Sequence, residues 1–165
     1  MFLCRRDRAG ERELWSVRRS RTVNIRPAGI KDLDRVSYIE SSCFEAERYP
    51  REMLEEILAR EGFLTFIAEE GEVLGAVTVH YAGEEAQLVS LAVLPGFRNR
   101  GVASALLRTA EDAARDLGAR EMVLQVRTLN VPAMNLYLHR GYVLAGIIRN
   151  YYGYRKDAFF MRRAL

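Results

Sequence analysis

The sequence predicts one α/β domain whose mixed sheet has antiparallel strand pairs at both ends and parallel neighbours where helices intervene. The first observation is the order of apolar patterns, which runs strand, two helices, three strands, helix, strand, helix and two strands. The second is the length of 165 residues, which suits one domain with a continuous core. No repeat, linker or low-complexity tract divides residues 22–165, so we expect them to form a single domain.

The first half of this pattern contains a strand and two amphipathic helices. Residues 22–28 alternate around Val23 and Ile25 and predict a short strand that ends at Pro27. Pro50 stands where a first helical turn accepts proline, so it marks the start of the second helix. The apolar residues with helical spacing are Ile30, Leu33, Val36 and Ile39 in the first helix, and Met53, Leu54, Ile57 and Leu58 in the second.

The second half is richer in strands. Two apolar runs meet at Glu70 and Gly71 and predict a hairpin. The following strand contains residues 88–94, which we expect to be buried on both faces. The remaining predicted elements are a helix over residues 103–117 that Gly118 ends, a strand over 121–128, a helix over 132–140 that Gly141 stops, and two strands around the sequence NYYGY.

Composition narrows the class of protein. The chain is 49% hydrophobic and 28% charged, as in a globular protein, and no apolar run approaches the ~18 residues of a membrane span. The first residues, MFLCRRDRAGER, lack the apolar region of a secretory signal. Cys4 and Cys43 form neither a CxxC pair nor a disulfide framework. These features predict a cytoplasmic location without membrane contact.

The basic character of the chain is confined to an N-terminal arm. Residues 1–21 contain seven arginines against Asp7, Glu11 and Glu13, a charge of +4 in a chain whose net charge is +3. Such an arm can contact RNA, the ribosome or another polyanion. The alternative is a solvated, partly disordered leader, which the interspersed acidic residues favour.

Residues 95–107 predict a loop that binds a phosphate group, because they join a strand to the start of a helix. A helix N-terminus presents unpaired N–H groups and the positive end of the dipole. Gly101 removes the side chain where a pyrophosphate would approach the backbone, and Arg98 and Arg100 add positive charge. The loop lacks the GKS/T and GxGxxG patterns of nucleotide sites. An ordinary strand-to-helix turn with a capping glycine is the alternative.

Three motifs in order resemble the GNAT superfamily of acetyltransferases. Arg98-x-x-Gly101-x-Ala103 resembles its R/Q-x-x-G-x-G/A signature. The segment VRTLNVPAMNLYLHRGY resembles its V-R-x-x-N-x-x-A-x-x-L-Y-x-x-x-G-F signature. The tail NYYGYRKDAFFM resembles the N-Y-Y-x-x-x-x-x-D-A stretch of the RimI-type, protein N-terminal acetyltransferase branch. The resemblance covers about residues 22–163. It implies a mixed, mostly antiparallel sheet with helices on both faces and a splayed central strand pair at residues 88–94 and 121–127.

The resemblance implies acetyl-CoA as the cofactor. It assigns backbone pairing with the pantetheine arm to Leu91 and Val93, and further cofactor contacts to Asn130 and Tyr137. An unpaired backbone N–H at the strand opening can stabilise the oxyanion. The residues it assigns to the pyrophosphate are Arg98, Asn99, Arg100, Gly101, Val102, Ala103 and Ser104.

The resemblance also implies the catalytic residues. Tyr137 matches the tyrosine near the thiolate leaving group, to which a phenol can donate a proton. Relatives carry a glutamate where this chain has Gln125, and a histidine or tyrosine near Gln87, and neither amide accepts a proton at neutral pH. The segment EAERYP resembles the L-P-E-N-Y loop of the N-terminal acetyltransferases, which implies Glu47 as the group that orients the amine or accepts its proton. The alternatives are Glu45, Glu84 and Glu85.

The implied substrate site lies between the loop of residues 44–50 and the last hairpin. The resemblance assigns the backbone of the substrate's first residues to Tyr151 and Tyr152, and the opposite wall to Phe44, Glu45, Glu47 and Tyr49. The missing base favours α-amines, of which roughly a third are neutral near pH 7.5, over lysines, which cost roughly 4 kcal/mol to deprotonate.

The expected function is transfer of an acetyl group from acetyl-CoA to protein N-terminal amines by direct attack. The first alternative is a lysine or small-molecule amine as the substrate. The second is a non-catalytic acyl-CoA-binding or ribosome-docking module that uses the basic arm. No metal is expected, because His80 and His139 are isolated in the sequence.

Overall fold

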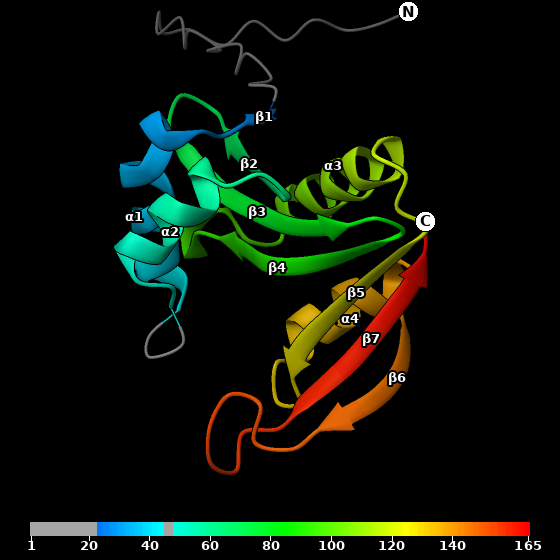
Figure 1. Cartoon of the computed structure of the whole chain (residues 1–165). Helices are drawn as coiled ribbons and strands as arrows, with labels where there is room; N and C mark the ends of the chain where they lie inside the picture. Colours follow the sequence, from blue (N-terminus) through cyan, green and yellow to red (C-terminus); the bar gives the residue numbers. More distant parts are fainter. Residues whose placement is uncertain (1–22, 45–47) are drawn as a thin grey trace, which may run out of the picture.

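The computed structural model describes residues 23–44 and 48–165. Their strands form a seven-stranded sheet with the order β1-β2-β3-β4-β5-β7-β6 (Figure 1). Only β4 and β5 pair in parallel, and the other pairs are antiparallel. The mixed, mostly antiparallel sheet is therefore confirmed. The predicted arm, residues 1–21, lies outside the described residues, as do Glu45 and Glu47.

The elements follow the predicted order. The strands are β1 (Asn24–Pro27), β2 (Phe63–Glu69), β3 (Val73–Ala82), β4 (Glu85–Val93), β5 (Glu121–Arg127), β6 (Val143–Ile148) and β7 (Ala158–Ala164). The α-helices are α1 (Leu33–Cys43), α2 (Arg51–Ala59), α3 (Val102–Asp116) and α4 (Val131–His139), and two short 3₁₀ turns cover Ile30–Asp32 and Pro95–Phe97.

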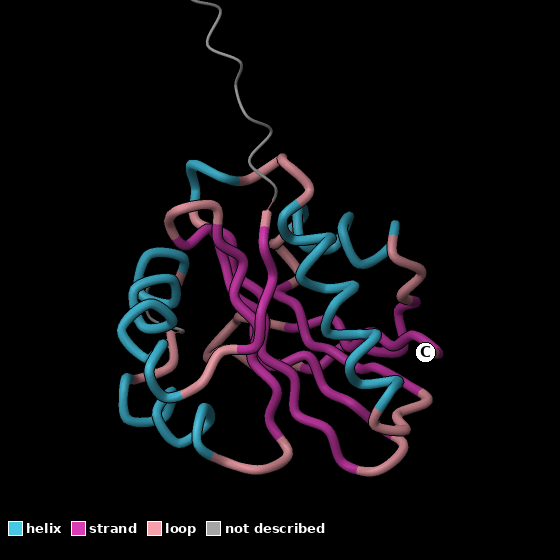
Figure 2. Tube along the Cα trace, turned by 90° about the horizontal axis from the view of Figure 1, so that it is seen from above, coloured by secondary structure: helices cyan, strands magenta, loops and turns pink. Residues whose placement is uncertain are grey.

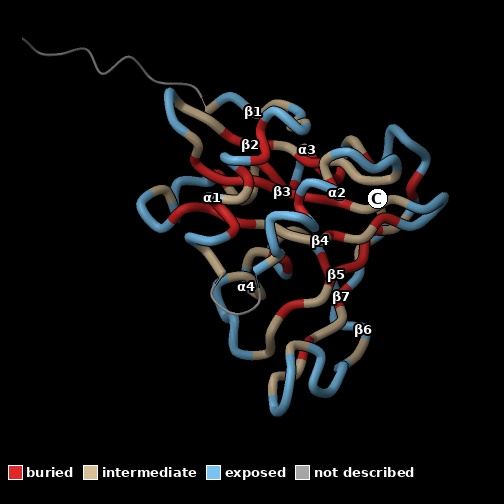
Figure 3. Tube along the Cα trace, turned by 60° about the vertical axis from the view of Figure 1, so that its left-hand side comes forward, coloured by how far each residue is buried: buried red, intermediate tan, exposed pale blue. Residues whose placement is uncertain are grey.

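The helices cover both faces of the sheet, as the family resemblance implied. Helices α1 and α2 lie on one side and α3 on the other (Figure 2). The α3 side holds the larger core, in which Leu106, Leu107 and Ala110 are fully buried and Tyr137 of α4 also packs. Each buried leucine of such a core contributes about 1.5–3 kcal/mol of transfer free energy. Buried residues concentrate on the central strands, whereas the edge strand β6 is exposed along most of its length (Figure 3).

The parallel pairing of β4 with β5 stops halfway along both strands. Residues 85–88 pair with residues 121–124, and the ladder ends at Leu88 and Leu124. On the β3 side, Thr78 pairs with Ser90 and Val79 with Leu88, so that Val89 forms a β-bulge. The two strands therefore splay from this point toward the end of β4.

This splay overturns one expectation from the sequence. Burial of residues 88–94 on both faces was expected, but Val89, Ser90 and Leu91 are only half-buried. The reason is that β5 covers the edge of β4 only as far as Leu88.

A buried carboxylate ties α3 to the second half of the sheet. Glu111 of α3 is 1% exposed, and its Oε1 accepts a hydrogen bond from the Tyr142 hydroxyl at 3.1 Å. Its Oε2 accepts a hydrogen bond from Arg140, at the end of α4, and lies 2.7 Å from the Arg163 guanidinium of β7. One side chain on α3 thus holds α4 and β7 in place.

We expect Glu111→Gln to lower the free energy of unfolding by about 2 kcal/mol, measured by urea denaturation. The two arginines would lose their counter-charge, and their exposed fractions of 27% and 26% keep the loss moderate. The control is Asp112→Asn on the same helix, whose exposed pair with Arg115 should be worth under about 0.5 kcal/mol. Equal effects of the two variants would contradict this role of Glu111.

Candidate functional site

The loop between β4 and α3 ends on a glycine that the backbone requires. Gly101 is the N-cap of α3 and has a φ of +78°, a left-handed conformation that L-residues adopt at a cost of about 1–2 kcal/mol. Its carbonyl accepts the first helical hydrogen bond, from Ala105 N at 3.0 Å. The amides of Val102, Ala103 and Ser104 therefore have no intrahelical acceptor. No side chain caps them, and the first turn of α3 contains no acidic residue.

The two arginines of this loop have different positions. Arg98 Nε donates a hydrogen bond to Val93 O at 3.0 Å, so its side chain folds back onto the end of β4. Arg100 is exposed, and its guanidinium lies 5.4 Å from the centroid of the Phe97 ring. Asn99 between them has a positive φ of 59°. Arg98 thus fixes the loop to the strand, while Arg100 faces solvent.

The backbone of β4 faces the opening beside β5. Leu94 N donates to Leu74 O at 2.9 Å, so the backbone groups of Leu94 point toward β3. Because these groups alternate sides along a strand, those of Leu91 and Val93 point away from β3, toward β5. No ladder with β5 reaches them, since that pairing ends at Leu88.

Helix α4 supplies Asn130 and Tyr137. The Asn130 side chain caps α4 by accepting a hydrogen bond from Ala133 N at 3.3 Å. Tyr137 is 7% exposed, and its ring packs edge-on against Tyr142 with 5.7 Å between centroids. Burial, and then the nearby Tyr152, raise the pKa of the Tyr137 hydroxyl above its ordinary value. The group is therefore protonated throughout the neutral range.

Four residues singled out from the sequence meet at the end of the β4–β5 ladder. Gln87 Nε2 donates to Gln125 Oε1 at 3.0 Å, across the two strands. The Tyr151 hydroxyl lies 3.4 Å from the same oxygen, and the Tyr152 hydroxyl donates to Gln125 O at 3.1 Å. The structure therefore joins the two amides to each other and to the paired tyrosines.

Asp157 shapes the loop that carries these tyrosines. Its carboxylate accepts hydrogen bonds from Asn150 N at 2.9 Å and from Arg149 at 2.7 Å, and both lower its pKa. Asn150 has a positive φ of 54°, and its side chain accepts a hydrogen bond from Arg155 N at 2.7 Å. The Asn and Asp of the tail motif thus hold the turn that presents Tyr151 and Tyr152.

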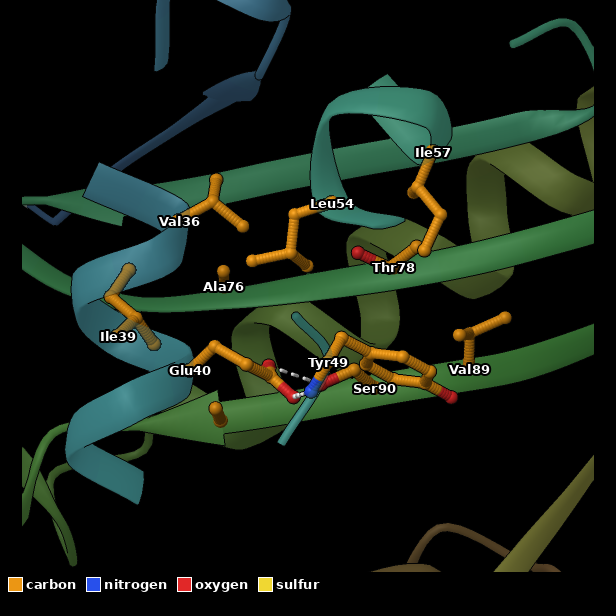
Figure 4. A pocket seen from close by; sticks show the side chains of 11 residues that line it. Val36, Ile39, Glu40, Tyr49, Leu54, Ile57, Ala76, Thr78, Val89 and Ser90 are labelled. Atoms are coloured by element: carbon orange, nitrogen blue, oxygen red, sulfur yellow. Dashed lines mark hydrogen bonds between the residues drawn. The ribbon is translucent and has the colours of Figure 1, made fainter. Parts of the chain in front are cut away.

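Sequence reasoning missed one residue, Glu40 of α1. Its carboxylate is 5% exposed and accepts hydrogen bonds from Tyr49 N and Ser90 Oγ, both at 3.2 Å (Figure 4). Burial raises the pKa of this carboxyl, and the two hydrogen bonds oppose the shift. The available signal was its place four residues after Val36, on the apolar face of the helix.

The loop of residues 44–50 is described only in part. Phe44 and Tyr49 are half-buried on either side of the gap, and Phe44 N caps the end of α1 by donating to Glu40 O at 3.0 Å. Glu45 and Glu47 lie outside the described residues. Within residues 23–44 and 48–165, no three His, Cys, Asp or Glu side chains gather as metal ligands. None of the helices in the same ranges is long and apolar enough to span a membrane.

Comparisons with known proteins agree on one family. Residues 30–142 match the model of the acetyltransferase (GNAT) family. An N-alpha-acetyltransferase of Sulfolobus acidocaldarius is 31% identical over 90% of this chain and 96% of its own length. A putative [ribosomal protein bS18]-alanine N-acetyltransferase of Bacillus subtilis is 30% identical over 78% of this chain and 85% of its own.

A solved structure of an N-acetyltransferase is also similar to this chain. The ribosomal-protein-S18-alanine N-acetyltransferase of Escherichia coli superposes with a TM-score of 0.79 at 27% identity, covering 87% of this chain and 94% of that one. The family model covers more than half of the chain, and the sheet, the helices on both faces and the loop before α3 agree with it. The chain therefore belongs to the GNAT family of acetyltransferases.

Proposed function

We propose that this acetyltransferase moves the acetyl group of acetyl-CoA to the N-terminal α-amine of proteins. The observation that carries the proposal is the convergence of Tyr151 and Tyr152 on Gln125, where the β4–β5 ladder ends. Phenol hydroxyls at this point can hold the backbone of a peptide that enters the opening. The names of the relatives from Sulfolobus, Bacillus and Escherichia support an α-amine as the acceptor.

The chain is an acetyl-CoA-dependent acyltransferase, and the loop before α3 fits the cofactor's pyrophosphate. The amides of residues 102–104 lack intrahelical acceptors, and Gly101 leaves the approach to them free of a side chain. We assign the pantetheine contact to the backbone of Leu91 and Val93, which faces the strand opening. Asn130 is assigned a cofactor contact as well. When bound, acetyl-CoA supplies an acetyl group activated as a thioester.

We assign Tyr137 the role of hydrogen-bond donor to the leaving sulfur. Its raised pKa keeps the phenol protonated, so it can stabilise a developing thiolate. The same raised pKa disfavours complete transfer of the proton, so solvent completes the protonation of the thiol. Tyr137 would thus lower the barrier for departure of the leaving group without changing its own charge.

The two amides at the end of the β4–β5 ladder bear on which kind of amine can accept the acetyl group. Gln87 and Gln125 cannot take up a proton at neutral pH, which favours a substrate that is already partly neutral. An α-amine meets this condition and a lysine does not. Glu47 remains the residue proposed to orient the amine, and Phe44, Glu45 and Tyr49 remain proposed contacts of the substrate.

The substrate class is tested with two peptides at pH 7.5. One has a free N-terminus and no lysine, and the other has a blocked N-terminus and one internal lysine. We expect thiol release from acetyl-CoA to be at least about tenfold faster with the free N-terminus, because a far larger fraction of α-amines is neutral. Faster acetylation of the lysine peptide would reject the proposed substrate.

Tyr137→Phe is expected to lower kcat about 100-fold while KM for acetyl-CoA stays within about twofold, because the lost hydroxyl acts on the leaving group. Steady-state kinetics measures both constants. Tyr142→Phe is the matched control, since that neighbouring hydroxyl bonds Glu111 and should affect stability only. A wild-type kcat in Tyr137→Phe would remove the residue from the mechanism.

Gly101→Ala is expected to weaken acetyl-CoA binding about tenfold, measured by calorimetry, because alanine resists the φ of +78° that aims the helix amides. Gly118→Ala imposes similar strain at the other end of α3, where φ is +98°. It should cost comparable stability without changing the dissociation constant. If the two variants bound acetyl-CoA with equal affinity, the loop before α3 would have no specific role in binding the cofactor.

A further inference from the structure

Glu40 is a buried acid without a cationic partner. Its two hydrogen-bond donors, Tyr49 N and Ser90 Oγ, are both neutral. Within residues 23–44 and 48–165 no arginine, lysine or histidine forms an ion pair with it. The other fully buried glutamate, Glu111, has two arginines beside it. A buried carboxylate is costly without compensation, and such groups concentrate at functional sites.

The surroundings of Glu40 form a small cavity that Tyr49 lines on one side. The cavity measures about 10 Å³, close to the room that one water molecule needs. Its other walls come from α1, α2, β3 and β4, and Figure 4 shows the carboxylate, Tyr49 and Ser90 gathered at one side. Most of the other lining residues are aliphatic. The polar groups at this place are therefore few and directed at one another.

Ser90 lies on β4, the strand that borders the opening, and lines this cavity. It follows the bulged Val89 and precedes Leu91, whose backbone faces the opening between β4 and β5. The Ser90 hydroxyl donates its proton to Glu40 Oε2, which leaves its oxygen lone pairs free to accept another proton. A hydroxyl in this arrangement can pass a proton from the opening to the carboxylate behind it.

We propose that Glu40, acting through the Ser90 hydroxyl, takes up the first proton that the substrate amine loses. The inference rests on the proposed function of the same site. It makes Glu40 the residue that accepts the proton indirectly, because the neutral amides Gln87 and Gln125 at the end of the β4–β5 ladder cannot take up a proton.

The protons of the proposed step are exchanged among the amine, Ser90, Glu40, the thiolate and solvent, and their number balances. An N-terminal ammonium gives up two protons in all. The first passes to Ser90 Oγ, which releases its own proton to Glu40, so the serine is unchanged and the amine has a free lone pair. The second leaves the nitrogen for solvent as the bond from nitrogen to the acetyl carbon forms and the bond from that carbon to sulfur breaks. The departing thiolate takes its proton from solvent with the help of Tyr137, and Glu40 returns its proton to solvent.

The role requires Glu40 to be ionised, so its contribution falls as the pH drops through its pKa. Burial raises this pKa, and hydrogen bonds from Tyr49 N and Ser90 Oγ act in the opposite direction. The titratable groups that face it are Tyr49 from the loop and Cys43 from its own helix. Burial raises the pKa of each, and the Arg98 guanidinium beside Cys43 opposes the shift of the thiol. Helix α2 and strands β3 and β4 present no charged side chain to the cavity.

The test compares kcat/KM for a free-N-terminus peptide in the full-length wild type and in Glu40→Gln at pH 6.5 and pH 9. Without a proton acceptor only neutral amines react, and these are about one in twenty at pH 6.5 but nearly all at pH 9. We expect the wild-type advantage to be about 100-fold at pH 6.5 and to shrink at least tenfold by pH 9. A purely structural role would give a ratio independent of pH, and that result would overturn the proposal.

Three further variants test the role of Glu40 and provide its controls. Ser90→Ala should reproduce the pH-dependent loss, and it replaces Glu40→Gln if thermal unfolding shows that variant to be unfolded. Glu56→Gln on the exposed face of α2 is the matched control and should retain wild-type kinetics. A pH-dependent loss in Glu47→Gln alone would transfer the role to Glu47 and overturn the proposal. If the wild type releases no thiol with any peptide, the proposed function fails, whereas an active wild type with a constant ratio rejects only Glu40.

Discussion

The site depends on the early end of the ladder between β4 and β5. Four residues of each strand pair, and the bulge at Val89 then follows on the β3 side. Beyond Leu88 the backbone groups of Leu91 and Val93 have no strand beside them on this side, although Val93 O accepts a hydrogen bond from Arg98. The N-terminus of α3 follows the open end of β4, and Tyr151 and Tyr152 contact Gln125 where the ladder ends. Continued pairing would close the sheet at this point.

An opening in the middle of a sheet removes hydrogen bonds that would otherwise join its halves, so other contacts must hold them. Helix α3 packs on β2, β3 and β4 of the first half. Its buried Glu111 reaches Tyr142, Arg140 and Arg163 of the second half. The carboxylate thus replaces part of the missing ladder with charge-assisted contacts, which are stronger than neutral ones. This arrangement lets the strands separate locally while the two halves keep a fixed relation.

The sequence was sufficient for the order of elements because each has its own local signal. Pro50, Gly118 and Gly141 mark helix ends to within a residue or two, and the apolar periods identify what lies between them. The half-exposure of Val89 to Leu91 was not predictable, because it depends on where a distant strand stops. Glu40 was missed for a related reason, since a lone glutamate on a helix usually faces water and its partners come from β4 and the loop. The two amides were visible individually, but only the fold brings Gln87 to Gln125.

The two neutral amides, Gln87 and Gln125, affect the pKa of a substrate amine that binds beside them. A glutamate at position 125 would place a carboxylate beside Tyr151, where it would stabilise the ammonium form of an incoming amine and raise its pKa. An amide at that position leaves the pKa of the amine near its ordinary value, so the reactive neutral form costs little to reach. In the proposed arrangement the carboxylate is set back behind Ser90, where it can receive a proton without binding the ammonium directly. In this proposal, binding of the amine and uptake of its proton are assigned to different groups.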